Sequence, residues 1–322
     1  MKVLFWGTPD FGLPSLDAMR REGHEIAGIV TNPDRPAGRG RPITASPVKR
    51  WAGSFGIPVL QPEKPRGSVF TEAVGALGPD VSVVAAYGQI LIDEVLALPP
   101  LGSINVHGSL LPLLRGAAPV NWALIRGHEE SGATIMRMVR ELDAGPVFER
   151  RALRLGEAMT AGALYEAIAR LGAEALVDVL ARIASGTAVE TPQDEAAATY
   201  APKLDRATAR LDWSLDTREV GRWMRGCDPW PGAWTSLGDE PVQLFSPNLA
   251  PSADGDARVT GPVGDTSGET GTILLADPGD GLWIRTGDGA IGVGEVKPSG
   301  KRRMTATEWL RGRRGLRGVR LA

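Results

Sequence analysis

Short apolar runs alternate with segments of helical periodicity along the first half of the chain. The apolar runs predict strands, and the periodic segments predict helices between them. We expect strands at Lys2–Gly7, Glu25–Thr31, Pro58–Gln61, Val81–Tyr87 and Ser103–His107, and helices at Ser15–Glu22, Pro47–Phe55 and Thr71–Leu77. This order predicts an α/β fold with a mostly parallel sheet and helices on both faces. Such sheets bind ligands beyond the carboxyl ends of their strands.

The second half of the chain changes character near residue 190. A long amphipathic helix is predicted at Ala161–Ala184, and a polar stretch without periodicity follows it. Beyond Lys203, one helix at Thr217–Gly226 precedes many short apolar runs separated by Gly, Pro, Asp and Ser, which is typical of a small barrel or sandwich. We therefore predict one domain over residues 1–190, a linker over 191–207 and a small β domain over 208–322.

The predicted strand that ends at His107 carries an unexpected polar face. Side chains alternate along a strand, so Ser103, Asn105 and His107 share one side. A central strand of a two-sided parallel sheet is normally apolar on both sides. An Asn amide can donate to an oxygen that becomes negative, and a His can exchange a proton near neutral pH. A buried hydrogen-bonded pair that orders a turn explains the same pattern, so both interpretations stay open.

Asp143 lies between two further predicted strands, Ala133–Val139 and Val147–Leu155, just before Gly145-Pro146. An Asp in this position commonly bonds to its own backbone and forms the turn. On the local sequence alone, the structural interpretation is preferred.

Cysteine and histidine are scarce in the chain. Cys227 is the one cysteine, and histidine occurs only at positions 24, 107 and 128. These numbers exclude an internal disulfide framework and a thiolate cluster, and we predict no catalytic metal. The apolar runs fall short of the roughly 18 residues of a membrane-spanning helix, and the N-terminus lacks the features of a signal peptide. We expect a cytoplasmic protein without membrane association.

Basic residues are concentrated in two segments, although the net charge is only −2. From Lys301 to Ala322 there are eight Lys and Arg against one Glu, and the loop after the second predicted strand holds Arg35, Arg39 and Arg41. Clustered arginine suggests a polyanionic partner such as RNA. A solvated terminal helix and an ordinary surface loop explain the same composition.

A longer motif resembles a known family. Asn105-Val106-His107-Gly108-Ser109-Leu110-Leu111-Pro112, followed by Arg115-Gly116-Ala117-Ala118-Pro119, is similar to the signature of the methionyl-tRNA formyltransferases. Further agreement lies at Gly7–Phe11, Pro33–Gly40, Ser46–Lys49, Ala86–Gly88, Leu142–Gly145, Tyr200–Lys203 and Pro229–Pro231. The resemblance therefore spans nearly the whole chain. It implies a Rossmann-like folate-dependent formyltransferase domain, followed by a small OB-like β-barrel that helps to hold tRNA.

The resemblance implies roles for individual residues. Catalysis would depend on Asn105, His107 and Asp143, of which Asp143 joins the other two only through the resemblance. Folate would bind at Ser109, Leu110, Leu111, Pro112, Tyr87, Gly88, Gln89, Ile90, Leu91, Val139, Arg140 and Glu141. The tRNA would contact the two basic segments, at Arg35, Arg39, Arg41, Lys301, Arg302 and Arg303. Two departures from the family's pattern adjoin these residues, namely Leu113-Leu114 and the pair Ala144 and Pro146.

The implied activity is transfer of a formyl group from 10-formyltetrahydrofolate to the α-amino group of methionyl-initiator tRNA, by a monomer without a metal. Asn105 and protonated His107 would stabilise the oxyanion, while Asp143 would orient His107 and accept a proton through water. Two alternatives stay open. One is a folate-dependent formyltransferase acting on an amino-sugar nucleotide or glycinamide ribonucleotide, and the other is a non-catalytic RNA-binding relative. The basic segments favour a polyanion larger than one nucleotide.

Overall fold

The computed structural model describes residues 1–36, 43–248 and 267–322. Contacts between residues divide the chain into two compact units. Unit 1 comprises residues 1–119, 130–154 and 165–202, and unit 2 comprises residues 120–129, 155–164 and 203–322. The two units interleave along the chain, and the domain boundaries expected at residues 190 and 208 stay a prediction.

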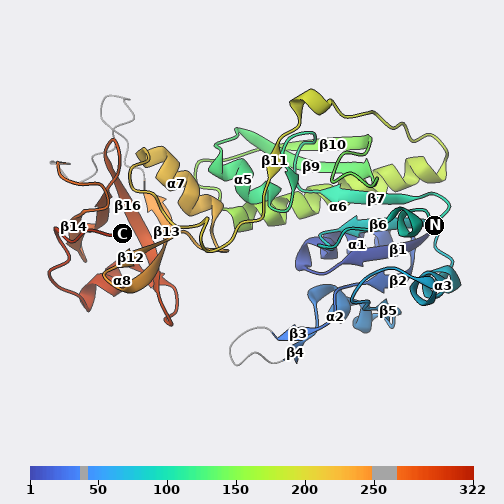
Figure 1. Ribbon diagram of the computed structural model, residues 1–322, viewed down its shortest axis with the longest axis horizontal. Coiled ribbons are helices and arrows are strands. Elements are labelled where there is room, and N and C mark those ends of the chain that lie inside the picture. The colour runs from blue at the N-terminus through green and yellow to red at the C-terminus, as the bar shows by residue number, and fades with distance from the viewer. Residues whose placement is uncertain (37–42, 249–266) are drawn as a thin grey trace. The chain divides into compact units, whose positions relative to one another are not determined.

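Unit 1 is built on a seven-stranded sheet with the strand order β10-β9-β7-β6-β1-β2-β5, which Figure 1 labels from top to bottom. The strands from β7 to β5 pair in parallel, whereas β9 and β10 are antiparallel at one edge. β6 is buried along its whole length, as a parallel strand covered on both faces should be. The predicted Rossmann-like, mostly parallel sheet is confirmed. Its strands are β1 Lys2–Gly7, β2 Glu25–Val30, β5 Val59–Leu60, β6 Val81–Ala85, β7 Ser103–His107, β9 Glu130–Arg137 and β10 Val147–Arg154.

The strand order reverses beside β1. The chain runs outward from β1 to β2 and β5, and then returns to β6 on the other side of β1. In open parallel sheets, ligands bind at such a reversal, outside the carboxyl ends of the strands. The loops that follow β1 and β6, with the neighbouring loop after β7, are therefore the favoured place for a ligand.

Helices cover both faces of this sheet. On one face, Gly172 of α6 lies against Val106 of β7. On the other face, Phe70 of α3 and Val95 of α4 share a core with Trp6 of β1. The helices are α1 Leu13–Arg21, α2 Pro47–Ser54, α3 Ser68–Leu77, α4 Asp93–Leu96 and most of α6 Ala161–Ala184, with 3-10 turns at Asp10–Gly12 and Glu195–Ala197. None of the helices that the structure describes has the length and apolar character needed to cross a membrane.

Two short strand pairs complete unit 1. The first is antiparallel and joins β3 Arg35–Pro36 to β4 Ile43–Thr44. The second is parallel and joins β8 Arg115–Gly116 to β11 Tyr200–Ala201. Through the second pair, Tyr200–Ala201, which lie in the predicted linker over residues 191–207, are bound to unit 1.

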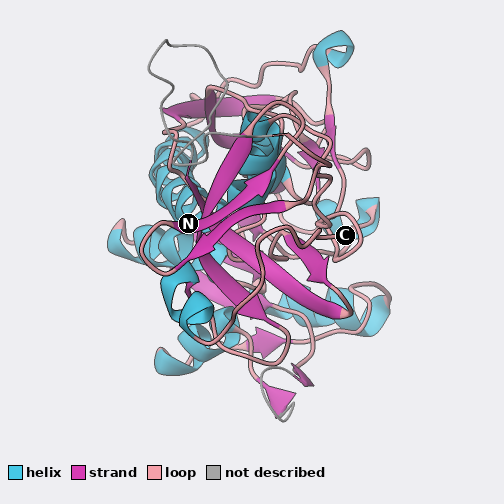
Figure 2. Ribbon diagram, turned by 90° about the vertical axis from the view of Figure 1, so that its left-hand side faces the viewer, coloured by secondary structure: helices cyan, strands magenta, loops and turns pink. Residues whose placement is uncertain are grey.

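Unit 2 is built on a curled antiparallel sheet, which faces the viewer in Figure 2. The strand order is β12-β13-β16-β15-β14, with β17 beside β16. C-terminal residues bridge the two edges of the sheet, because Leu321 pairs with Leu237 of β12 and Arg320 pairs with Thr272 just before β14. The predicted small barrel-like domain is confirmed. Its elements are β12 Trp234–Leu237, β13 Glu240–Asn248, β14 Ile273–Asp277, β15 Gly281–Arg285, β16 Ala290–Pro298, β17 Met304–Thr305, α7 Thr217–Gly226, α8 Ala306–Arg311 and most of α5 Pro119–Ile125.

Side-chain caps fix where several helices begin. Ser46 accepts a hydrogen bond from the Lys49 amide at the start of α2, and Pro47 follows it. Thr305 and Glu308 cap each other's backbone amides at the start of α8. Such caps satisfy amide groups that have no partner inside the helix. The local sequence therefore sets these boundaries.

Replacing two helix glycines by alanine, one in α6 and one in α3 for comparison, tests how closely α6 packs on β7. A Cβ atom at Gly172 would lie 2.7 Å from Cγ1 of Val106, whereas nothing lies within 4 Å of a Cβ at Gly75 of α3. Overpacking costs about 1–3 kcal/mol, and replacing a helix Gly by Ala gains about 1 kcal/mol. We therefore expect Gly75→Ala to raise the free energy of unfolding measured in urea, and Gly172→Ala to lower it. Equal stabilisation by both changes would contradict the close contact.

Candidate active site

Strand β7 delivers two polar side chains to the carboxyl end of the sheet. Val106 faces α6, whereas Ser103 Oγ donates to the Leu96 carbonyl of α4 on the opposite face, at 3.0 Å. Because side chains alternate, Asn105 and His107 share the face of Ser103. The polar face expected from the sequence is present.

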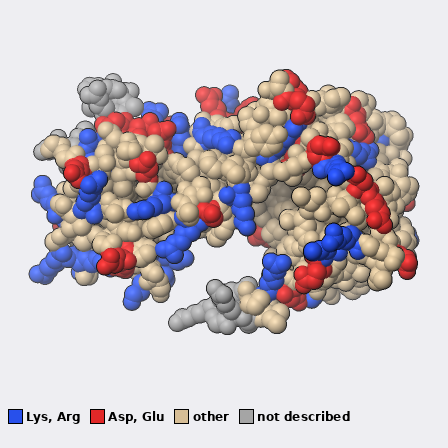
Figure 3. Space-filling model, viewed as in Figure 1, with Lys and Arg blue, Asp and Glu red and all other residues tan. Residues whose placement is uncertain are grey.

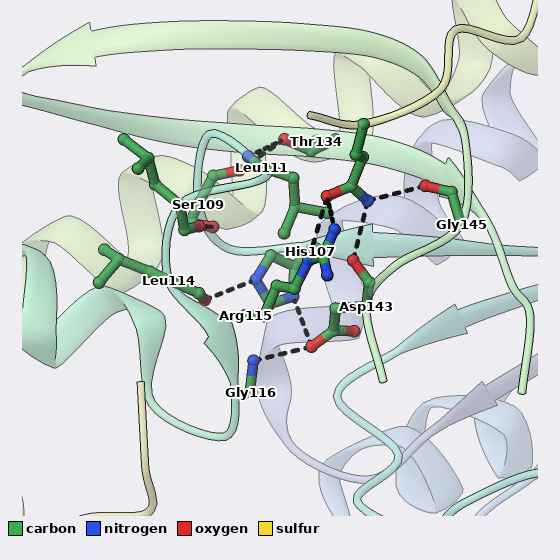
Figure 4. A network of polar contacts seen from close by, with 11 residues as sticks. His107, Ser109, Leu111, Leu114, Arg115, Gly116, Thr134, Asp143 and Gly145 are labelled. Carbon is green, nitrogen blue, oxygen red and sulfur yellow. Dashed lines mark hydrogen bonds and ion pairs between the residues drawn. The ribbon is translucent and has the colours of Figure 1, made fainter. Parts of the chain in front are cut away.

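His107 is held between two loops (Figure 4). Its Nε2 lies 3.0 Å from the carbonyl oxygen of Leu114, and its Nδ1 lies 3.7 Å from Oδ2 of Asp143. A carbonyl oxygen only accepts hydrogen bonds, so Nε2 carries a hydrogen and donates it. Nδ1 is then the atom at which the ring gains or loses a proton, and it faces the Asp143 carboxylate. The side chain is buried, with 5% of its surface exposed.

Asp143 belongs to the loop between β9 and β10. Its φ of 52° is in the left-handed region, which residues other than glycine rarely adopt. Oδ2 accepts a hydrogen bond from the amide of Gly116, 27 residues away, at 2.8 Å. The turn-forming role that the local sequence suggested is therefore not the one that this oxygen plays, because it bonds to a distant loop.

Asn105 is half-buried, and its amide makes no hydrogen bond with any residue that the structure describes. An amide donor of this kind can stabilise an oxygen on which negative charge develops. Across the described ranges, no three His, Cys, Asp or Glu side chains are grouped in a way that could hold a metal ion.

The turn after β7 is braced by its neighbours. Thr134 Oγ1 donates to the carbonyl of Ser109 at 2.6 Å and accepts from the amide of Leu111 at 3.1 Å. Arg150 Nε donates to the carbonyl of Leu111 at 2.5 Å. The Leu111 side chain is buried against β9 and β10. The turn over residues 109–112 therefore has a fixed backbone, and Leu111 offers no side-chain surface to a ligand.

The loop after β6 is anchored from the end of β2. Asn32 Nδ2 donates to the carbonyl of Tyr87 at 2.8 Å, and its Oδ1 accepts from Gln89 Nε2 at 2.6 Å. Tyr87 and Leu91 are buried in the core beneath the loop, and burial raises the pKa of the Tyr87 phenol to about 12. Gly88 and Ile90 are exposed on its outer side. The sequence did not indicate Asn32 as a support of this loop.

Exposed apolar side chains lie in the loops around the reacting centre. Ile90 is 79% exposed after β6, and Leu142 is 60% exposed after β9. Arg140 and Glu141 are exposed in the same loop as Leu142, and Val139 is half-buried. Apolar surface beside a few polar groups is the usual lining of a site for an organic ligand.

Arg35 is exposed at the start of the short strand β3. The carboxylate of Asp34, next to Arg35 in the chain, accepts a hydrogen bond from Lys49 at 2.6 Å and another from Gln61 at 2.8 Å. These two hydrogen bonds lower the pKa of Asp34. Arg39 and Arg41 lie outside the residues that the structure describes.

Lys and Arg side chains of unit 2 are numerous on the face shown in Figure 3. Lys301 and Arg302 are exposed, and Arg302 Nη2 donates to Glu308 on the surface, at 3.1 Å. Arg303 is half-buried, and its guanidinium donates to Asp228 at 2.6 Å and to Glu295 at 2.5 Å. Its guanidinium also lies 4.0 Å from the centre of the Phe245 ring. The three consecutive basic residues are therefore not equivalent.

Several polar residues that support the site were not singled out from the sequence. Arg115 is 2% exposed, and its guanidinium binds Glu195 at 2.7 Å and Gln193 at 2.8 Å. Thr199 accepts a hydrogen bond from the amide of Leu114 at 2.9 Å. Arg115 falls in the family motif, which is the one signal that could have marked it. Gln193, Glu195 and Thr199 lie in the stretch without periodicity.

Comparisons with known proteins cover both parts of the chain. Residues 1–180 match the family model described as "Formyl transferase", and residues 203–314 match "Formyl transferase, C-terminal domain". A methionyl-tRNA formyltransferase of Ruminiclostridium cellulolyticum is 38% identical over 97% of this chain and 96% of its own length. Another, of Desulfotalea psychrophila, is 41% identical over 97% of this chain and 93% of its own.

A solved structure of HypX from Aquifex aeolicus, in complex with tetrahydrofolic acid, has the same fold at 20% identity and a TM-score of 0.66. The match covers 96% of this chain but only 47% of HypX, so the chain spans slightly less than half of that protein. With both family models matched and two relatives above 30% identity over nearly the whole length, this chain belongs to the formyl transferase family.

Proposed function

We propose that this protein transfers the formyl group of 10-formyltetrahydrofolate to the α-amino group of methionyl-initiator tRNA. The observation that carries the chemistry is the contact of buried His107 with Asp143, on the strand that also carries Asn105, whose amide has no hydrogen-bond partner among the described residues. Similarity to two methionyl-tRNA formyltransferases over nearly the whole chain supports the acceptor. The fold shared with tetrahydrofolate-bound HypX supports the carrier.

The residues around the reacting centre fit a folate. A pterin is flat and aromatic with polar edges, and the exposed Ile90 and Leu142 offer apolar surface for its faces. The backbone groups of the braced turn over residues 109–112 can meet its polar edges. Residues 87–91 and 139–141 would complete the pocket, with Tyr87, Leu91 and Leu111 supporting it from the core rather than by side-chain contact.

The geometry gives each catalytic side chain a distinct task. When bound, the carrier supplies a formyl group attached to N10. As the amine nitrogen bonds to the formyl carbon and the bond to N10 breaks, Asn105 and the Nδ1–H of charged His107 donate to the formyl oxygen. Asp143 orients His107 and accepts the proton lost by the amine through a water molecule, and that proton returns through water to N10 as its bond to the formyl carbon breaks. An α-amine has a pKa of about 8, so it needs no strong base.

The acceptor also accounts for the basic residues that have no role in the chemistry. Arg35, Lys301 and Arg302 are exposed and placed to meet phosphates, and we include Arg39 and Arg41 in the same role. We further propose that the protein works in the cytoplasm, where charged initiator tRNA is used, and that it acts as a monomer.

Formylation of alternative acceptors tests the proposed function. The purified protein, supplied with 10-formyltetrahydrofolate, is expected to formylate charged initiator tRNA and to leave an amino-sugar nucleotide and glycinamide ribonucleotide unmodified. Removing one oxyanion donor costs about 3 kcal/mol, so Asn105→Ala should lower kcat roughly a hundredfold. Asn105→Asp keeps the size of the side chain but loses the N–H donor, and it should lose at least as much.

The same assay can contradict each part of the proposal. Formylation of one of the small amines instead of tRNA would reject the acceptor. RNA binding without transfer to any acceptor would indicate a non-catalytic relative. A kcat near that of the unaltered protein in both Asn105 variants would reject the role of Asn105.

The salt dependence of tRNA binding should separate Lys301 and Arg302 from Arg303. Each phosphate neutralised by a basic side chain adds about one unit to the slope of log affinity against log salt concentration. We expect Lys301→Ala and Arg302→Ala each to reduce this slope, measured with charged initiator tRNA. Arg303→Ala should mainly lower thermal stability, because it leaves the buried Asp228 without its ion-pair partner. Equal loss of slope in all three variants would contradict this division.

A further inference from the structure

Residues 191–201 form a strap that crosses unit 1 and is anchored by backbone pairing at both ends. Thr191 pairs with Val147 at the start of β10. Tyr200 and Ala201 form β11, which pairs with β8. Between these anchors, the strap sends side chains to the two loops that hold His107.

The amide of Gln193 connects these loops, because it bonds to Asp143 in one and to Arg115 in the other. Its Nε2 donates to the carbonyl of Asp143 at 2.8 Å and to the carbonyl of Gly145 at 2.7 Å. Its Oε1 accepts from Arg115 Nη2 at 2.8 Å and from Arg115 Nε at 3.2 Å. Both N–H groups and both lone pairs of the amide are therefore used. No other side chain of this length offers two donors and an acceptor together.

The strap also holds the two residues near His107 that adopt an unfavourable backbone conformation. Asp143 has a φ of 52° and Leu114 a φ of 60°. Such residues keep this conformation only where the surroundings enforce it, and they are frequent at active sites. Gln193 holds the carbonyl of Asp143, and Thr199 Oγ1 accepts from the amide of Leu114 at 2.9 Å. One segment thus fixes both contacts of the His107 ring.

An ion pair between Arg115 and Glu195 holds the strap next to Gln193. Arg115 is buried, and Glu195 of the strap binds its Nη1 at 2.8 Å and its Nη2 at 2.7 Å. These bonds raise the pKa of Arg115 and lower that of Glu195. Removing Arg115 would leave Glu195 without its ion-pair partner and the side-chain oxygen of Gln193 without its donors, and so disturb the whole strap. Gln193 is therefore the residue at which the effect on Asp143 can be isolated.

We propose that Gln193 is a positioning residue of the formyl transfer, which sets the distance between the Asp143 carboxylate and Nδ1 of His107. It touches neither reacting group and acts by holding the backbone of Asp143. This inference rests on the proposed function, because positioning has an effect only where the pair takes part in the reaction.

Variants of Gln193 and of its neighbour test the inference. Gln193→Met keeps the length and loses all the hydrogen bonds, while Gln193→Glu turns an oxygen toward the carbonyls of Asp143 and Gly145. A displacement of this kind typically lowers the rate roughly tenfold to a hundredfold, so we expect kcat to fall by this factor in both variants. KM for the formyl donor should stay within about twofold, since the groups that bind it are not changed. Asp194→Ala is the control, because the Asp194 side chain lies in the strap but, among the described residues, bonds only to the amide of Ala196.

A double-mutant cycle separates positioning from general support of the fold. If Gln193 acts through Asp143, adding Gln193→Met to Asp143→Asn should lower kcat by less than about threefold further. Thermal melting shows whether each variant is folded. If Gln193→Met does not fold, Gln193→Glu takes its place in the cycle.

Three results would overturn the inference. They are an unchanged kcat in both Gln193 variants, an equal loss of kcat in Asp194→Ala, and a full additional loss on the Asp143→Asn background. Failure of the unaltered protein to formylate charged tRNA would reject the proposed function, and the inference with it. That result differs from all three, because in each of them the unaltered protein is active.

Discussion

The hydrogen bond between His107 and the carbonyl of Leu114 determines how the reacting centre can work. Because a carbonyl cannot donate, the bond places a hydrogen on Nε2 and leaves Nδ1 to exchange protons beside Asp143. Leu114 offers its carbonyl from a backbone in the left-handed region, and Asp143 approaches the ring in the same unusual conformation. The site therefore depends on the contacts that enforce these two conformations.

The fold supplies these contacts from elements that are distant in sequence. β7 brings Asn105 and His107 to the carboxyl end of a parallel sheet, beside the reversal of strand order at β1. β9 and β10 carry the loop of Asp143, and the amide of Gly116 orients its carboxylate. The strap over residues 191–201 then ties the loops together through Gln193 and Thr199. Sheet, loops and strap position one proton-exchanging group on the strand face of Asn105, whose amide has no partner among the residues that the structure describes.

The sequence predicted the sheet and the polar face of β7 well, because alternation and helical periodicity are local signals. The predicted bounds of β1, β7, α6 and α7 agree with the structure to the residue. Asp143 could be joined to His107 only by resemblance, since its contacts with Gly116 and His107 cross the chain and leave no periodic pattern. The strap escaped prediction for the same reason. Its hydrogen bonds run to distant backbone groups, so its sequence has only the polar composition of a linker.

The protonation of the His107 ring is the most direct measure of this account. Nitrogen NMR at alkaline pH distinguishes the two neutral tautomers, and with three histidines in the chain a His107→Asn variant assigns the signal. The account predicts a hydrogen on Nε2 and an unprotonated Nδ1. A hydrogen on Nδ1 of the neutral ring would contradict it, because Leu114 would then face a lone pair and Asp143 would not adjoin the atom that exchanges the proton.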